Sequence, residues 1–107
     1  MEPLLILTNV PDRPTAEKLA SALVESGAAA CVNVLAACHS IYRWQGKVET
    51  AEEIPLLIKT TMSAYSRLEQ IIRSLHPYAL PEIIAVPITN GLPEYLAWVV
   101  QETEEHE

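Results

Sequence analysis

Two segments near opposite ends of the chain, residues 4–9 and 83–88, are apolar at almost every position. Because the side chains of a strand alternate between the two faces of a sheet, such a run has both of its faces buried. A chain of 107 residues is about one domain long, so we expect one domain over residues 1–107 with both segments in one sheet. Whatever covers the two faces of this sheet therefore decides the architecture.

Helical periodicity predicts three helices. The first is capped by Asp12 or Thr15 and stopped by Gly27, and its apolar face is Ala16, Leu19, Ala20, Leu23 and Val24. The second is capped by Ser63 and ended by Pro77, with Ala64, Leu68, Ile71, Ile72 and Leu75 on one face. The third begins near Pro93, and residues 102–107 follow it as an acidic tail.

Two long strands lie between the first two helices, over residues 29–42 and 47–61. Residues 44–47 join them in a turn in which Gly46 can adopt positive φ. Pro55 has no N–H for the strand ladder, so we expect a bulge or an exposed edge there.

The element order is βαββαβ followed by a helix, which predicts an α+β domain: a ferredoxin-like sandwich with an antiparallel sheet and a C-terminal helix. We expect the first and third strands to lie adjacent and parallel at the centre, with the second and fourth flanking them. Right-handed crossovers place both main helices on one face. The opposite face is then bare but apolar, which predicts a homo-oligomer that covers it.

The charge balance limits the classes of partner that the protein is expected to bind. The formal net charge is −7, from 14 acidic and 7 basic residues, whereas nucleic-acid binding needs a basic surface. No apolar run approaches the roughly 20 residues of a membrane span, and the start lacks the basic segment of a signal peptide. We expect a cytoplasmic protein with no nucleic-acid or membrane partner. Cys31 and Cys38 would lie roughly 23 Å apart on one strand, too far for a disulfide.

Polar residues gather where the predicted strands one and three end and strands two and four begin. These residues are Thr8, Asn9, Cys31, Lys59, Thr60 and Glu82. Pairing about the Gly46 turn puts Cys31 opposite Ile58 or Lys59. The loop with His76 and Tyr78 enters the last strand at the same edge. Carboxyl ends of strands are common places for sites, so this edge is the candidate site.

Each candidate also has a structural interpretation. Cys31 lies in an apolar run and fits a small core residue, while Lys59 could extend from the sheet edge into solvent. His76 could bond a carbonyl at the end of the second helix instead of a ligand. Cys38 and His39 suit copper, but neighbours on a strand point to opposite faces, so His39 is expected to face solvent. No matched acid, base and nucleophile is visible, so we do not expect an enzyme.

Two motifs are specific as a pair: Y-x-W-x-G-K over residues 42–47 and H-P-Y-x-x-P-E over residues 76–82. Further stretches at 11–12, 29–33, 57–61 and 95–98 accompany them. Together they resemble the CutA divalent-cation-tolerance proteins, from Leu4 to about Glu102.

The resemblance implies a homotrimer of ferredoxin-like protomers, similar to the PII nitrogen-signalling proteins, with sheets packed inward and long hairpins paired between subunits. It also implies a role in tolerance to copper and other divalent cations. The bacterial copper pattern has a Cys where Thr8 stands and a first His where Leu75 stands, and only its second His is kept, as His76. Either Cys31 substitutes, or three His76 residues converge in the trimer, or metal binding is weak.

Two hypotheses for function follow. In the first, the protein is a trimeric metal-binding protein that holds copper or another divalent cation with His76 and Cys31. In the second, it is a PII-like sensor or adaptor that binds an anionic metabolite in the inter-subunit cleft implied by the resemblance. The residues of that cleft are Trp44, Lys59, Tyr78 and Glu82. Tyr42 and Trp44 fit either a subunit contact or this cleft.

Overall fold

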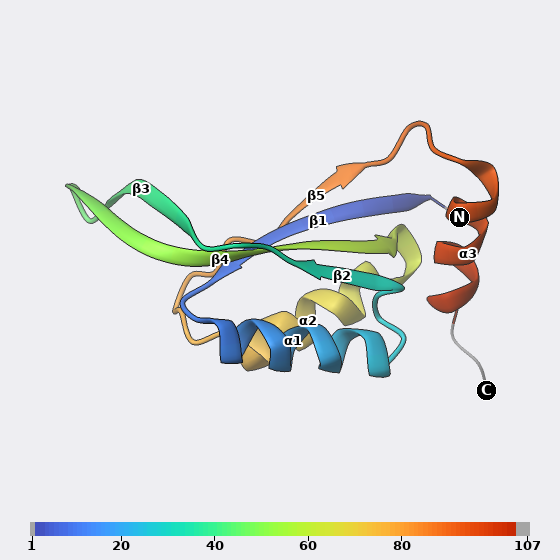
Figure 1. The fold of residues 1–107 in the computed structure, drawn as a ribbon, viewed down its shortest axis with the longest axis horizontal. Helices are drawn as coiled ribbons and strands as arrows, with labels where there is room; N and C mark the ends of the chain where they lie inside the picture. Colours follow the sequence, from blue (N-terminus) through green and yellow to red (C-terminus); the bar gives the residue numbers. More distant parts are fainter. Residues whose placement is uncertain (1, 105–107) are drawn as a thin grey trace.

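The computed structural model describes residues 2–104 (Figure 1). Its elements, in chain order, are β1 (Pro3–Val10), α1 (Arg13–Glu25), β2 (Cys31–Val34), β3 (Cys38–Trp44), β4 (Lys47–Thr61), the 3₁₀ turn η1 (Met62–Ala64), α2 (Tyr65–Leu75), β5 (Ile84–Pro87) and α3 (Pro93–Glu102). The predicted element order is confirmed, with one predicted strand divided into β2 and β3. No helix in the described part of the chain is long and apolar enough to cross a membrane.

The sheet has the strand order β2-β4-β1-β5, and β3 pairs with the outer half of β4. All of these pairs are antiparallel. The expectation that the first and third strands are parallel is therefore wrong, because β1 pairs with β4 from Leu4 with Thr60 to Val10 with Ile54. In this split-βαβ unit the parallel strands, β1 with β2 and β4 with β5, are each separated by an inserted strand. The carboxyl end of β1 consequently lies beside the middle of β4.

The predicted strand over residues 29–42 is interrupted opposite Pro55. Pairing of β2 ends with Val34 opposite Leu56, and pairing of β3 begins with Cys38 opposite Glu53. Three residues of this strand thus face two of β4, which is a bulge of one residue. The predicted irregularity at Pro55 is confirmed, but the extra residue lies in the partner strand. The N–H of Leu35, at the bulge, donates to the Pro55 carbonyl at 3.0 Å.

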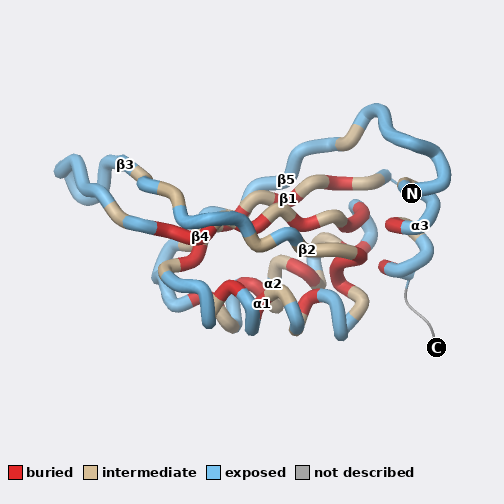
Figure 2. Tube along the Cα trace, viewed as in Figure 1, coloured by how far each residue is buried: buried red, intermediate tan, exposed pale blue. Residues whose placement is uncertain are grey.

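Helices α1 and α2 cover one face of the sheet (Figure 1). Burial alternates along β1, and the core between sheet and helices consists of apolar residues from β1, β4, α1 and α2, shown in red in Figure 2. The most fully buried are Ile6, Leu19, Leu23, Leu56, Ile58, Leu68 and Ile72.

The helix ends agree only partly with prediction. Asp12 caps α1 by accepting the N–H of Thr15 at 2.8 Å, and Gly27 follows the helix with a φ of +76°. Helix α2 is entered through η1, with Ala64 at its N-cap, so the predicted Ser63 cap is wrong. The predicted acidic tail begins too early, because Glu102 ends α3 and Thr103 is buried. Residues 105–107 lie outside the described residues.

The other face of the sheet, here called the open face, carries apolar side chains that none of the helices among residues 2–104 covers. They are Leu5, Leu7, Leu57, Ile84 and Val86, all half-buried or exposed. Helix α3 lies at the end of the sheet instead of over this face, and Val99 is its buried residue (Figure 1). The predicted bare apolar face is confirmed, and an assembly that covers it stays a prediction.

Strand β3 and the outer half of β4 form a two-stranded arm that extends beyond the helices (Figures 1 and 2). At its tip Gln45 has a φ of +50° and Gly46 a φ of +81°. Positive φ at both central residues is the geometry of a type I′ hairpin turn, whose twist matches that of the strands. The predicted positive φ of Gly46 is confirmed.

Candidate functional site

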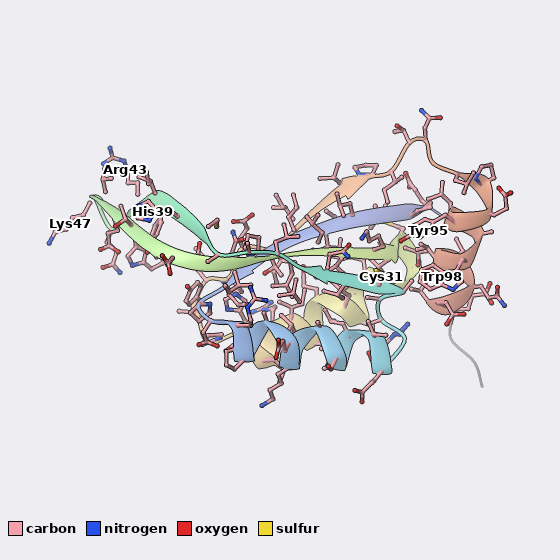
Figure 3. All side chains as sticks on the ribbon, in the orientation of Figure 1. Cys31, His39, Arg43, Lys47, Tyr95 and Trp98 are labelled. Atoms are coloured by element: carbon pink, nitrogen blue, oxygen red, sulfur yellow. The ribbon has the colours of Figure 1, made fainter. Side chains whose placement is uncertain are left out.

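The strand register divides the predicted polar edge between two ends of the sheet. Asn9 pairs with Pro55 next to the arm, whereas Cys31 pairs with Lys59 next to α3. Lys59 in turn pairs with Leu5, four residues from Asn9, which is about 13 Å along a strand. Figure 3 shows Cys31 beside α3 and away from the arm. The expected convergence of these residues at one edge is wrong because it required parallel central strands.

At the α3 end, Cys31 faces Lys59 as predicted. The Lys59 ammonium donates to the side-chain oxygen of Asn33 and lies 3.9 Å from the Cys31 sulfur. Tyr95 of α3 lies beside Cys31, and its ring centroid is 5.5 Å from that of Trp98 (Figure 3). Burial raises the pKa of Tyr95, and the nearby Cys31 adds to the shift. Lys59 therefore belongs to a small polar cluster on the open face.

At the other end, an open hollow of about 840 Å³ lies between the arm and the loop after α2, and we call it the hairpin groove. Its lining residues are Asn9, Ser40, Ile41, Tyr42, Trp44, Glu49, Glu53, Tyr78, Ala79, Leu80, Pro81, Glu82, Ile83 and Ile84. Three predicted cleft residues, Trp44, Tyr78 and Glu82, line this groove. The fourth, Lys59, does not.

His76 does not line the groove but joins two segments that do, β1 at Asn9 and the loop at Tyr78. Its side chain is buried, and its Nε2 lies 2.6 Å from the backbone carbonyl of Asn9. Its Nδ1 accepts the backbone N–H of Tyr78 at 3.2 Å. A carbonyl only accepts and an amide N–H only donates, so Nε2 carries the proton and the lone pair of Nδ1 is occupied. The structural interpretation of His76, in which it bonds a carbonyl, is confirmed in part. The carbonyl belongs to Asn9 of β1 and not to the end of a helix.

Glu53 is a carboxylate with only 8% of its surface exposed. The Tyr78 hydroxyl donates to its Oε2 at 3.0 Å. Burial raises the pKa of Tyr78 to about 12, and Glu53 adds to the shift by accepting from the neutral phenol and repelling the phenolate. Tyr78 therefore remains a donor at neutral pH. Nearby, the side-chain amide of Asn9 donates to Glu82 at 3.0 Å, which ties the loop to β1.

Sequence reasoning missed Glu53. Strand alternation places it on the same face as Pro55 and Leu57, but a glutamate next to Glu52 on a long hairpin is ordinarily exposed. It is buried because the loop carrying Tyr78 lies against it. The path of that loop has no periodic signal, so alternation alone could place Glu53 on the open face but could not bury it.

The residues of one chain do not fit a copper site. Thr8, in the position of the expected Cys, is buried on the helix-covered side, and Leu75 packs against the core. Both His76 nitrogens have protein partners, and Cys31 lies at the other end of the sheet. In the described part of the chain no three His, Cys, Asp or Glu side chains are grouped closely enough to hold a metal ion. Copper needs several nitrogen or sulfur donors in a fixed geometry.

Cys38 and His39 also lack a shared site. Cys38 contacts Ser40, with 3.6 Å between sulfur and oxygen, whereas His39 is exposed opposite Glu52. The predicted solvent-facing position of His39 is confirmed.

Comparison with known proteins agrees with the motifs. The model of the family described as CutA1 divalent ion tolerance protein matches residues 4–102. The chain belongs to this family. It is 47% identical to the divalent-cation tolerance protein CutA of Thermus thermophilus, covering 96% of this chain and 99% of that protein. It is 45% identical to mouse protein CutA over 88% of its length, but it spans only about half (53%) of that protein.

The fold agrees as well. A solved structure of the Thermus thermophilus divalent cation tolerance protein superposes with a TM-score of 0.94 at 45% identity, covering 95% of this chain and 99% of that one. The predicted resemblance to CutA proteins is confirmed.

Proposed function

We propose that this protein acts in divalent-cation tolerance as a homotrimeric binding protein of the cytoplasm, and that its ligand site is the hairpin groove. The observation that carries the proposal is the chain of contacts from Asn9 through His76 and Tyr78 to Glu53, which fixes one wall of the groove. Small-molecule sites are concave, mostly apolar, and oriented by a few fixed polar groups. The proposed role is binding, because the groove combines apolar and aromatic walls with a few polar groups that can orient a ligand.

The groove is tested by the fluorescence of Trp44. The chain has two tryptophans, so a Trp98→Phe variant makes Trp44 the only reporter. We expect at least one member of a panel of small cations, neutral molecules and anions to change its emission in a saturable way. A Trp44→Phe variant that keeps Trp98 should give no such change. A panel with no saturable change would contradict a ligand site in the groove.

The trimer is supported by the uncovered open face and by the long arm. Light scattering should give three times the mass of one chain. Leu7→Lys places a charge on the open face and should lower that mass, whereas Ser21→Lys adds the same charge on the exposed side of α1 and should not. A monomeric wild type would contradict the assembly.

Copper binding through His76 is disfavoured because both ring nitrogens are occupied. We expect copper titrations of wild type and His76→Ala, under oxidising and reducing conditions, to give the same small amount of bound metal per chain. Tight binding that is lost in His76→Ala would contradict the present proposal and support a metal site at this histidine.

A second candidate is an anion site at Lys59, a half-buried residue of the open face whose ammonium donates to Asn33. It corresponds to the PII-like sensor or adaptor with an anionic metabolite. A metabolite screen by thermal shift should then find a stabilising anion, and Lys59→Ala should abolish the shift. A shift that survives Lys59→Ala would exclude this site.

A further inference from the structure

We propose that the hairpin groove recognises an organic cation, a molecule or side chain carrying an ammonium or guanidinium group. This inference rests on the proposed function, in that it takes the groove as the ligand site, and it adds the chemical class of the ligand. The organic cation takes the place of the anionic metabolite that the second hypothesis assigns to a cleft containing Lys59.

The charge of the groove has one sign. Three of its lining residues are glutamates, Glu49, Glu53 and Glu82, and its described lining contains no Lys, Arg or His. Clefts lined by one sign of charge concentrate counter-ions of the opposite sign. Lys47 faces Trp44 at the tip of the arm but does not line the groove, so an anion inside the groove would meet three carboxylates. The groove therefore selects against the class of ligand that Lys59 suggested.

Glu53 adds a second, independent argument. It is more than nine-tenths buried, it lines the groove, and its one polar contact among the described residues is the Tyr78 hydroxyl. A buried carboxylate is stable only when it is paired or well hydrogen-bonded, and one neutral phenol leaves most of its acceptor capacity unused. Neither Glu53 oxygen is both fully enclosed and without a partner, so the acceptor positions that Tyr78 leaves free are accessible to a cation in the groove.

The walls of the groove suit an organic cation. Three aromatic side chains, Tyr42, Trp44 and Tyr78, line it, and each is 37–41% exposed. The face of an aromatic ring attracts ammonium and guanidinium groups, tryptophan most strongly, and such rings form the binding sites of quaternary ammonium ligands. Tyr42 and Trp44 on β3 face Glu49 and Lys47 on β4, so the arm itself supplies this wall.

The same features disfavour a bare metal ion. The carboxylates do not form a group of three close enough to coordinate a metal within the described chain. The volume of about 840 Å³ is that of a pocket for a small organic molecule, for which 300–1,000 Å³ is typical. Charge that is spread around an aromatic cavity suits a bulky, weakly hydrated cation better than an ion that requires tight coordination.

Such a cation has two possible sources. One is a free metabolite with an amine, quaternary ammonium or guanidinium group. The other is a basic side chain of a second copy of this chain, and the tip of the arm carries Arg43 and Lys47 (Figure 3). The chemistry recognised is the same, so the experiment must separate the sources.

The test uses the full chain in the Trp98→Phe background, with choline chloride and agmatine as probes. Sodium chloride at equal ionic strength and disodium succinate serve as controls. Two further variants are compared: Glu53→Gln, which removes the buried charge and keeps its shape, and Glu52→Gln, which removes the neighbouring carboxylate on the opposite face of β4. Trp44 emission gives binding, and light scattering gives the assembly state.

For a free cation, choline or agmatine should saturate the Trp44 signal, with a Kd at least about tenfold weaker in Glu53→Gln and unchanged in Glu52→Gln. For a cation from a second copy, the free probes should not bind, and Glu53→Gln should lower the mass of the assembly while Glu52→Gln does not. Charge-neutral variants at Arg43 and Lys47 should reproduce that loss. Either result supports recognition of a cation, but the second would make the groove a subunit contact and would contradict the ligand site of the proposed function.

The inference is overturned if neither probe binding nor assembly depends on Glu53. It is also overturned if succinate or a neutral molecule binds while both cations fail, although the groove would then remain a ligand site and the proposed function would stand. If no ligand of any class binds, and Glu53→Gln does not change the mass of the assembly, then both this inference and the groove as a ligand site are contradicted.

Discussion

Strand β4 passes through two different environments. Its inner half, residues 53–61, is buried at alternating positions under α1 and α2, whereas its outer half, residues 47–52, is almost fully exposed in the arm. The two halves have the same backbone conformation and the same antiparallel pairing. The inner half therefore provides the stability of one chain, and the outer half presents side chains that this chain does not need in order to fold. Glu53 and the groove lie at the junction.

The largest expected difference between the halves is in stability. Ile58 is fully buried and Val48 is 65% exposed. Ile58→Ala should lower the free energy of unfolding by about 2–5 kcal/mol, because it removes core contacts and leaves a cavity. For the dissociated chain, Val48→Ala should change it by less than about 0.5 kcal/mol. Urea unfolding followed by circular dichroism at several protein concentrations measures both. A larger loss that shrinks on dilution would come from arm contacts in the proposed trimer, whereas a large loss that persists in the dissociated chain would contradict the comparison.

The next effect compares the two histidines of the described chain. His76 joins β1 to the loop after α2 through both ring nitrogens, whereas His39 is exposed in the arm. His76→Ala leaves the Tyr78 N–H and the Asn9 carbonyl without this partner, so it should cost about 1–3 kcal/mol of unfolding free energy. His39→Ala should be close to neutral. Equal stability of the two variants would show that the His76 contacts do not hold the loop.

The features that the sequence predicts are those that depend on residues close together in the chain. Periodicity is a local property, so the helices, the extent of β4 and the Gly46 turn were predictable from residues such as Leu19, Leu23 and Gly46. The bare apolar face is predictable because right-handed crossovers place both main helices on the other face of the sheet.

Strand direction and the path of a loop depend on contacts between residues that are distant in the sequence, so periodicity does not predict them. Placing β1 parallel to β4 moved Asn9 and Lys59 to one edge, although the antiparallel register puts them about 13 Å apart. The family motifs did bring Trp44, Tyr78 and Glu82 together, because a resemblance carries spatial information that periodicity lacks. Glu53 was missed because a loop that is distant in sequence buries it.

At the junction, the Tyr78–Glu53 hydrogen bond should be visible as a pH effect. Burial, then Glu53, raises the pKa of Tyr78 to about 12 from its usual value of 10.0. Because the folded state favours the protonated phenol, its stabilising contribution is complete below about pH 10 and is lost as the pH rises through about 12. In an ultraviolet difference titration, Tyr78→Phe should remove a late-titrating tyrosine, and Glu53→Gln should move that step to lower pH. An unchanged titration in Glu53→Gln would mean that burial alone sets the shift.

The smallest expected effect concerns Lys59, on the inner half. Its ammonium contacts Asn33 and Cys31 at the α3 end and does not line the groove. Lys59→Gln should therefore leave the response of Trp44 to organic cations unchanged within about twofold, since two sites this far apart with no shared partners act independently. A loss as large as that of Glu53→Gln would mean that the two ends of the sheet meet in the assembled protein. Lys59 of one copy would then approach the groove of another, and the division of β4 into a stabilising half and a recognition half would hold for a single chain only.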